Sequence, residues 1–118
     1  MNEELKTTIR QSNGLAIIQF IGDVTTFAED VVQGAYQEAS RGGGHHIGLD
    51  FTACEYINSA GIAVIIGVVT EARRKGQLVY AFGLSNHYHK LFRMVGLIDY
   101  MQVCTTEAEA LNHVSQTA

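Results

Sequence analysis

The sequence contains no proline and no tryptophan, and its only two cysteines among 118 residues are Cys54 and Cys104. Two cysteines are too few for a disulfide scaffold, so we interpret both as reduced thiols. Basic residues are also scarce, because 8 Lys and Arg stand against 12 Asp and Glu, for a formal net charge of -4. This balance leaves no basic field for phosphate backbones, which argues against nucleic acid as a direct partner.

The sequence also lacks an apolar run long enough for a membrane span. The longest run, Ala60 to Val69, is well short of the ~20 residues that a spanning helix requires, so it is interpreted as a buried helix. The first residues, Met-Asn-Glu-Glu, have neither the positive flank nor the apolar segment of a signal peptide. We therefore expect a cytoplasmic protein without membrane insertion.

The composition that remains is that of a folded protein. Hydrophobic residues make up 47% of the chain and charged residues 17%, which permits a buried core. Since domains usually contain ~100 to 200 residues, we expect a single domain over residues 1–118.

Five segments have the composition of strands. The nearly continuous apolar segment Leu15 to Ile21 is typical of a strand covered on both faces, and the weaker Thr7 to Arg10 is its expected hairpin partner. Alternation of Ile47, Leu49 and Phe51 with polar or small residues predicts a second main strand. Further strands are expected over Gln77 to Phe82 and around Tyr100 to Val103.

Between the strands lie four segments with helical spacing. Capping-box patterns, Thr26 with Glu29 and Thr106 with Glu109, predict the start of the first and last helices. The first helix is expected over about Phe27 to Ser40, ended by Gly42, Gly43 and Gly44, with these positions inward: Phe27, Val31, Val32, Ala35, Tyr36 and Ala39. The second is expected over Ser59 to Lys75, ended by Gly76. The third is capped by Ser85 or Asn86 and ended by Gly96, with Tyr88, Leu91, Phe92 and Val95 inward, and the final helix has Ala108, Leu111 and Val114 inward. The order ββαβαβαβα predicts an α/β fold with a central mixed sheet of about four to five strands and about four helices.

The connection after the second main strand is the candidate site, because function in such sheets gathers at strand ends and helix N-termini. Asn58 is a good N-cap, which makes Ser59 the first helical residue, next to free backbone N–H groups and the positive end of the helix dipole. A phosphate on Ser59 would be electrostatically favoured.

The small residues Ala60, Gly61 and Ala63 are expected to leave the helix start uncovered, so that a partner could approach Ser59. The structural alternative is that Asn58 and Ser59 merely cap a core helix, while the small residues pack on the sheet.

These residues resemble a known family. Leu49-Asp50-Phe51, then Tyr56-Ile57-Asn58-Ser59-Ala60-Gly61-Ile62 and Arg73-Arg74-Lys75-Gly76, are similar to the STAS domain of bacterial anti-sigma factor antagonists. The likeness runs from about Leu15 to Leu111. It implies that Ser59 is phosphorylated by a partner that is both a serine kinase and an anti-sigma factor. The unphosphorylated form would bind this partner and free the sigma factor, and a serine phosphatase would restore that form.

The resemblance also implies which residues contact the partner. Members of the family commonly have Asp directly before the serine, where this chain has Asn58. They also commonly have an acidic residue in the loop after the first main strand, where this chain has Thr25. Asp23 is the candidate to replace that acidic residue. The expected partner-binding residues are Asp23, Thr25, Asn58, Ser59, Ala60 and Gly61. ATP would be held by the kinase, so no cofactor is expected in this chain.

The sequence also has features of other functional classes. One alternative is a STAS subunit of a transporter or lipid-handling complex in which Ser59 is never phosphorylated, and Asn58 favours it. A hydrolase nucleophile elbow needs Gly where this chain has Ile57. Neither His87 nor His89 has a spacing that pairs it with Asp50 in a catalytic triad. We therefore expect that the protein is not an enzyme and has no catalytic residues. The pairs His45-His46 and His87-x-His89 resemble metal ligands only loosely, and no metal is expected.

Overall fold

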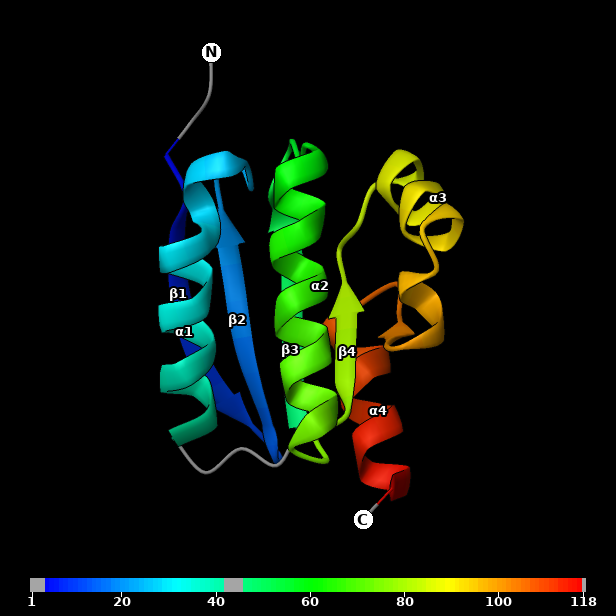
Figure 1. Cartoon of the computed structure of the whole chain (residues 1–118). Helices are drawn as coiled ribbons and strands as arrows, with labels where there is room; N and C mark the ends of the chain where they lie inside the picture. The colour runs from blue at the N-terminus through cyan, green and yellow to red at the C-terminus, as the bar shows by residue number, and fades with distance from the viewer. Residues whose placement is uncertain (1–3, 42–45, 118) are drawn as a thin grey trace.

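A five-stranded sheet runs through the computed structural model, which describes residues 4–41 and 46–117 (Figure 1). The strands lie side by side in chain order. β1 pairs antiparallel with β2, while β2, β3, β4 and β5 are parallel, so the predicted mixed sheet is confirmed. The strands are β1 Lys6–Ser12, β2 Leu15–Ile21, β3 His46–Ala53, β4 Val79–Phe82 and β5 Gln102–Val103.

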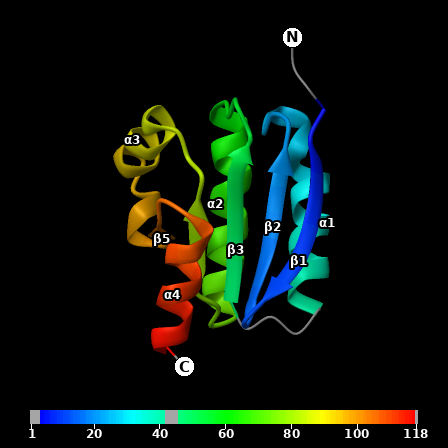
Figure 2. The ribbon, with the colours of Figure 1, turned by 180° about the vertical axis from the view of Figure 1, so that it is seen from behind.

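Helices cover both faces of the sheet. The four α-helices of the described residues are α1 Glu29–Arg41, α2 Ser59–Arg74, α3 Asn86–Met94 and α4 Glu107–Thr117. α1 and α2 lie side by side over one face, and α4 lies on the opposite face (Figures 1 and 2). Two 3-10 turns, η1 Thr26–Ala28 and η2 Leu97–Asp99, were not predicted. No described helix is both long and apolar enough to cross a membrane.

The core consists of two clusters separated by the sheet. In the larger cluster, the ring of Phe51 lies between Phe20, at a centroid distance of 5.0 Å, and Phe92 of α3, at 5.7 Å. The smaller cluster, under α4, includes Leu15, Ile17, Tyr80, Phe82, Cys104, Ala110 and Val114. Because β2 contributes side chains to both clusters, the expectation of a strand covered on both faces is confirmed.

The first capping-box prediction is wrong. Thr26 is not an N-cap but the first residue of η1, in which the Ala28 N–H donates to the Thr25 carbonyl, and α1 begins only at Glu29. A 3-10 turn advances about 120° per residue, so the face of the chain changes there. Ala28 is buried, while Phe27, predicted to point inward, is 90% exposed.

The second capping pattern is confirmed in part. The Glu109 N–H donates to the Thr106 hydroxyl at 3.2 Å, but the Glu109 carboxylate accepts from the N–H of Thr105 instead of closing the box on Thr106. Ala108, expected inward, is exposed, whereas Ala110 is buried. Residues two apart on a helix point in nearly opposite directions, which explains this error.

Other helix and strand ends differ from expectation by one or two residues. Lys75 is the C-cap of α2, β4 begins at Val79, and Ser85, not Asn86, caps α3 by accepting from the Tyr88 N–H. Val95, also predicted inward, is 47% exposed because it follows the end of α3. The prediction that three glycines end the first helix concerns residues 42–44, which lie outside the described residues.

Candidate functional site

Two loops meet where β2 and β3 end. The Val24 N–H donates to the Tyr56 carbonyl at 2.9 Å, and the Asn58 N–H donates to the Val24 carbonyl at 3.2 Å. Val24 and Ile57 form an isolated parallel bridge between the loops. Because backbone hydrogen bonds join the loops on both sides of Ile57, the start of α2 has a defined position against the loop after β2.

The start of α2 has the predicted geometry. Asn58 is extended, and its side-chain oxygen accepts a hydrogen bond from the Gly61 N–H at 2.8 Å. Ser59 is the first helical residue, and its side chain is exposed. The hydroxyl therefore lies beside the backbone N–H groups and the positive dipole end of a sixteen-residue helix.

The sequence had suggested that Gly61 helps to leave the helix start uncovered, and this prediction is wrong. It is buried, and a Cβ atom built on it would overlap the Val24 carbonyl oxygen and lie 2.7 Å from the carbonyl carbon. Gly61 therefore permits the close approach of the loop after β2 to α2. The open surface beside Ser59 comes from Ala60, which is partly exposed, and Ala63, which is exposed.

The structure also places the other predicted contact residues near this end of the sheet. Asp23 and Thr25 flank Val24, and both line a shallow cavity of about 410 Å³. Phe27, which sequence reasoning placed in the core, lines the same cavity with its ring exposed. The 3-10 turn η1, which carries Phe27, packs against α2.

The architecture and this loop arrangement agree with a known family. Residues 6–110 match the model of the STAS domain. The chain belongs to the STAS domain family. The resemblance stated from the sequence and the predicted α/β fold are thereby confirmed.

Relatives of this STAS domain include proteins of known name. The anti-sigma-B factor antagonist of Listeria monocytogenes serovar 1/2a is 25% identical over 109 residues, which cover 92% of this chain and 95% of that protein. A solved anti-sigma factor antagonist from Mycobacterium paratuberculosis has a TM-score of 0.82 at 13% identity, over 95% of each chain. The phosphorylated form of the Bacillus cell fate determinant SpoIIAA has a TM-score of 0.70 at 20% identity, over 92% of this chain and 99% of that one.

A hydrogen bond that was not predicted from the sequence joins the loop before Asn58 to α3. The buried N–H of Ile57 donates to the hydroxyl of Tyr88 at 2.9 Å. Sequence reasoning treated Tyr88 only as an apolar position of a helix. The phenol supplies the partner for a backbone group that would otherwise be buried without one, directly before Asn58.

Tyr88→Phe should therefore destabilise the domain although it retains the ring. The Ile57 N–H would lose its acceptor, and an unsatisfied buried donor costs about 1–3 kcal/mol. Urea unfolding followed by circular dichroism measures this change. Tyr56→Phe, which removes a hydroxyl from a 47% exposed side chain of the same loop, is the matched control and should stay within about 0.5 kcal/mol. Equal stability of the two variants would show that the hydroxyl of Tyr88 does not support the loop.

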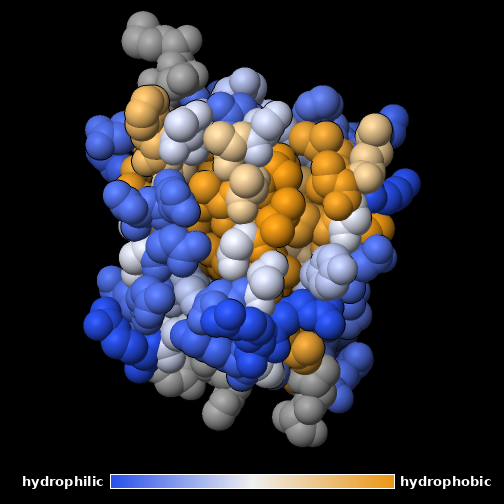
Figure 3. Space-filling model, viewed as in Figure 1, coloured by the Kyte–Doolittle hydropathy of each residue, from blue (hydrophilic) through white to orange (hydrophobic). Residues whose placement is uncertain are grey.

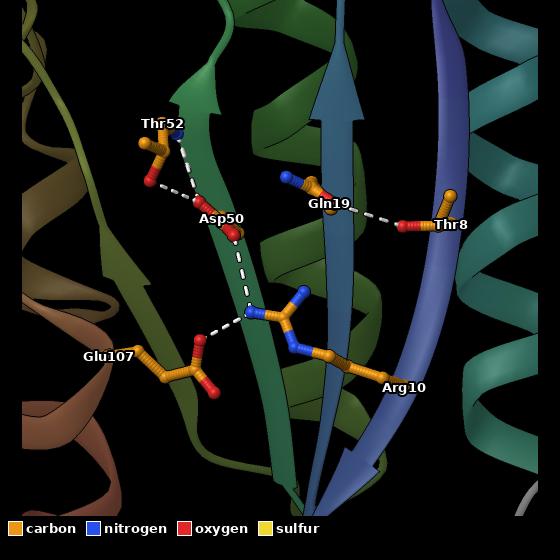
Figure 4. Close-up of polar contacts among 6 residues, drawn as sticks. All are labelled: Thr8, Arg10, Gln19, Asp50, Thr52 and Glu107. Atoms are coloured by element: carbon orange, nitrogen blue, oxygen red, sulfur yellow. Dashed lines mark hydrogen bonds and ion pairs between the residues drawn. The ribbon is translucent and has the colours of Figure 1, made fainter.

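Asp50, considered above as a partner for a catalytic histidine, is engaged elsewhere. Its side chain is 6% exposed and faces Arg10 of β1 at 3.3 Å, while Arg10 also pairs with Glu107 of α4 (Figure 4). The other Asp50 oxygen accepts from the Thr52 N–H at 2.9 Å and from its hydroxyl at 2.6 Å. The hydrogen bond with Glu107, more than that with Asp50, raises the pKa of Arg10. The arrangement joins β1, β3 and α4.

The two cysteines, and the histidines His46 and His87, have contacts that suit a role in the fold. Burial raises the pKa of the Cys54 and Cys104 thiols to about 11, so both stay protonated at neutral pH. His46 Nδ1 accepts from the Leu78 N–H at 3.1 Å, and the His87 ring contacts that of Tyr88. Within residues 4–41 and 46–117, no three His, Cys, Asp or Glu side chains gather into a metal site. His45 lies outside these ranges.

Proposed function

We propose that this STAS domain is a phosphorylation-regulated anti-sigma factor antagonist with Ser59 as its phosphoacceptor. The unphosphorylated chain binds a serine kinase that is also an anti-sigma factor, phosphorylation ends the complex, and a serine phosphatase restores the binding form. The observation that carries the proposal is the exposed Ser59 at the first position of α2, capped by the neighbouring Asn58 and not by its own hydroxyl. The Listeria relative is named an anti-sigma-B factor antagonist, which supports the role of anti-sigma factor antagonist for this chain.

The position of Ser59 suits a switch that works by charge. A phosphate adds about -1.5 to -2 charge and three acceptor oxygens, which the N-terminus of α2 can accommodate through its dipole and free N–H groups. Because the Ser59 side chain is exposed, the modification requires no rearrangement of the core. It would instead place charge at the centre of the contact surface and turn a fitted interface into a repulsive one.

The proposed contact surface combines two parts of the chain. The loop after β2 contributes Asp23 and Thr25, and the start of α2 contributes Asn58, Ser59 and Ala60. Phe27 joins them as the exposed large side chain beside Asp23 and Thr25. Aromatic side chains are enriched at the energetically dominant positions of protein interfaces. Gly61 is buried beneath this surface, where its lack of a side chain lets the loop after β2 approach the start of α2 closely.

Phosphate transfer tests the proposal directly. The unphosphorylated chain is used to capture its serine kinase from the native host, and the purified pair is incubated with ATP. Intact mass should show the gain of one phosphate, and peptide mapping should place it on Ser59. Release of the kinase should follow, and treatment with the phosphatase should restore binding. Phosphate on Thr25, Thr26 or Ser85 with Ser59 unmodified would contradict the assignment.

The name of the Listeria relative also favours this role over the alternative weighed from the sequence, a permanently docked subunit of a transporter or lipid-handling complex. That alternative had rested on Asn58, where members of the family commonly have Asp.

Asn58→Asp should leave folding intact and speed phosphorylation. Aspartate keeps the oxygen that accepts from Gly61 N–H and adds a charge favourable to the dipole, so stability should be unchanged or rise by about 0.3–1 kcal/mol. If a basic group of the kinase meets this position, the initial rate of Ser59 phosphorylation should rise. The phosphorylated form should gain less stability, because its phosphate is repelled by the new carboxylate.

Thermal melts of both forms and initial phosphorylation rates measure these effects. Ser85→Asp is the matched control, since it keeps a cap at the start of α3 and should not change the rate at Ser59. A slower rate for Asn58→Asp with unchanged melting would show that the kinase is adapted to asparagine, contrary to the expectation.

A further inference from the structure

An apolar groove lies on the face of the sheet that carries α1 and α2, away from the start of α2. It has a volume of about 520 Å³ and runs between the C-terminal half of α2 and the segment that follows α3. Figure 3 shows hydrophobic side chains gathered around the middle of this face, with a hydrophilic band below them. The side chains that line it include Ile66, Val69, Val95, Leu97 and Tyr100.

The groove has the size and surface of a small-molecule site. Sites for small ligands typically measure about 300–1,000 Å³ and are mostly apolar, with a few polar groups that orient the ligand. Ile66 is 41%, Val95 47% and Tyr100 55% exposed, so the apolar lining is open to solvent. Such a contiguous exposed apolar surface marks a binding site more often than an isolated exposed side chain does.

One end of the groove is basic, although the chain as a whole carries a formal charge of -4. Arg74 is paired with Glu71 at 2.6 Å. Arg73 instead places its guanidinium carbon 4.9 Å from the centre of the Tyr100 ring, and it forms no ion pair with any described residue. Stacking occupies the face of a guanidinium and leaves the N–H donors at its edge, which match a carboxylate or phosphate.

We propose that this groove binds a single-chain amphiphile with an anionic head group. The alkyl chain lies between the exposed side chains of Ile66 and Val95, over a floor to which the buried Val69 and Leu97 contribute. The head group pairs with Arg73 beside Tyr100. The site is distinct from Ser59, because Ile66 lies seven residues further along α2, about 10 Å along the helix axis. The inference therefore goes beyond the proposed function and does not depend on phosphorylation.

The test uses the unphosphorylated full chain and dodecanoate below its critical micelle concentration. Calorimetric titration should show saturable binding of one dodecanoate per chain. NMR shifts should change at Ile66 and Leu97 but not at Ala35, which is buried under α1. Dodecyl phosphate should bind as well. Dodecyltrimethylammonium, with the same tail and a cationic head, should bind at least about tenfold more weakly, because it lacks the charge-assisted pair with Arg73.

Two exposed positions separate the head-group contact from the tail contact. Arg73→Gln should weaken dodecanoate binding about tenfold without changing the affinity for dodecanol, which carries no charge. Ile66→Glu should abolish binding of both. The matched controls are Arg41→Gln, at the end of α1, and Met94→Glu, at an 81% exposed side chain that does not line the groove. Both controls should bind as the unmodified chain does, and melting curves verify that all four variants fold.

Several results would overturn the proposal. These are no saturable binding, equal affinity for the cationic amphiphile, or equal effects of Arg73→Gln and Arg41→Gln. Binding to anionic phospholipid vesicles without binding to free dodecanoate would assign the groove to a membrane surface instead. Loss of kinase capture by Ile66→Glu, with no amphiphile bound to the unmodified chain, would assign it to a protein partner. Since no kinase is present in the titrations, failure of phosphorylation at Ser59 leaves the outcome unaffected.

Discussion

The Ser59→Ala chain is expected to take up no phosphate from the serine kinase while it keeps its affinity for that kinase. Alanine lacks the oxygen that would attack the γ-phosphate of ATP, so the loss should be complete. Stability should change by less than about 0.5 kcal/mol, because Asn58, not Ser59, caps α2 and alanine is a strong helix former. Intact mass after incubation with ATP, and calorimetric titration against the kinase, measure the two effects.

The matched control for Ser59→Ala is Ser85→Ala. Ser85 caps α3 through its hydroxyl, which accepts from the Tyr88 N–H at 3.3 Å, so its loss should cost about 1 kcal/mol and leave phosphorylation intact. Ser59→Asp should weaken kinase binding only in part, since it adds one charge where phosphate adds up to about two. A Ser59→Ala chain that still gained phosphate, or a Ser59→Asp chain with unchanged affinity, would place the switch elsewhere on the molecule.

The regions predicted best from the sequence are those in which a local pattern has one structural explanation. The bounds of β2 were predicted correctly, because a strand buried on both faces requires a continuous apolar run. The start of α2 was predicted because an asparagine N-cap acts within three residues. The error at Thr26 arose where periodicity alone could not distinguish one turn of 3-10 helix from the first turn of an α-helix.

The support of the candidate site could not be predicted, because it consists of contacts between distant parts of the chain. Ile57 and Tyr88 are 31 residues apart, and only the packing of α3 beside the loop brings them together. Arg10 and Glu107 are 97 residues apart. Gly61 was predicted as an open surface because its role depends on Val24, a residue of another loop that the sequence does not place against the helix.

Gly61→Ala is expected to destabilise the domain at least as strongly as Tyr88→Phe. The added methyl group would overlap the Val24 carbonyl and lie 3.1 Å from a methyl group of Ile57. A backbone carbonyl cannot rotate aside as a flexible side chain can, so the two loops must separate or α2 must shift. Overpacking of this kind costs about 1–3 kcal/mol and occasionally more, and denaturant unfolding measures it. The strain also acts on the hydrogen bond between the Asn58 N–H and the Val24 carbonyl, so hydrogen exchange at Asn58 should accelerate.

Gly34→Ala is the matched control for this effect, because Gly34 also lies within a helix but a Cβ atom there meets nothing within 4 Å. Replacing an exposed helical glycine with alanine should stabilise the domain by about 0.5–1 kcal/mol, so the two substitutions should change stability in opposite directions. Since Asn58 and Ser59 follow the loop that Gly61 holds, Gly61→Ala should also slow phosphorylation of Ser59, whereas Gly34→Ala should not. If Gly61→Ala melted at or above the temperature of the unmodified chain, the close approach of Val24 to α2 would not be required for folding, and the placement of Ser59 would have to depend on the Asn58 cap and Tyr88 alone.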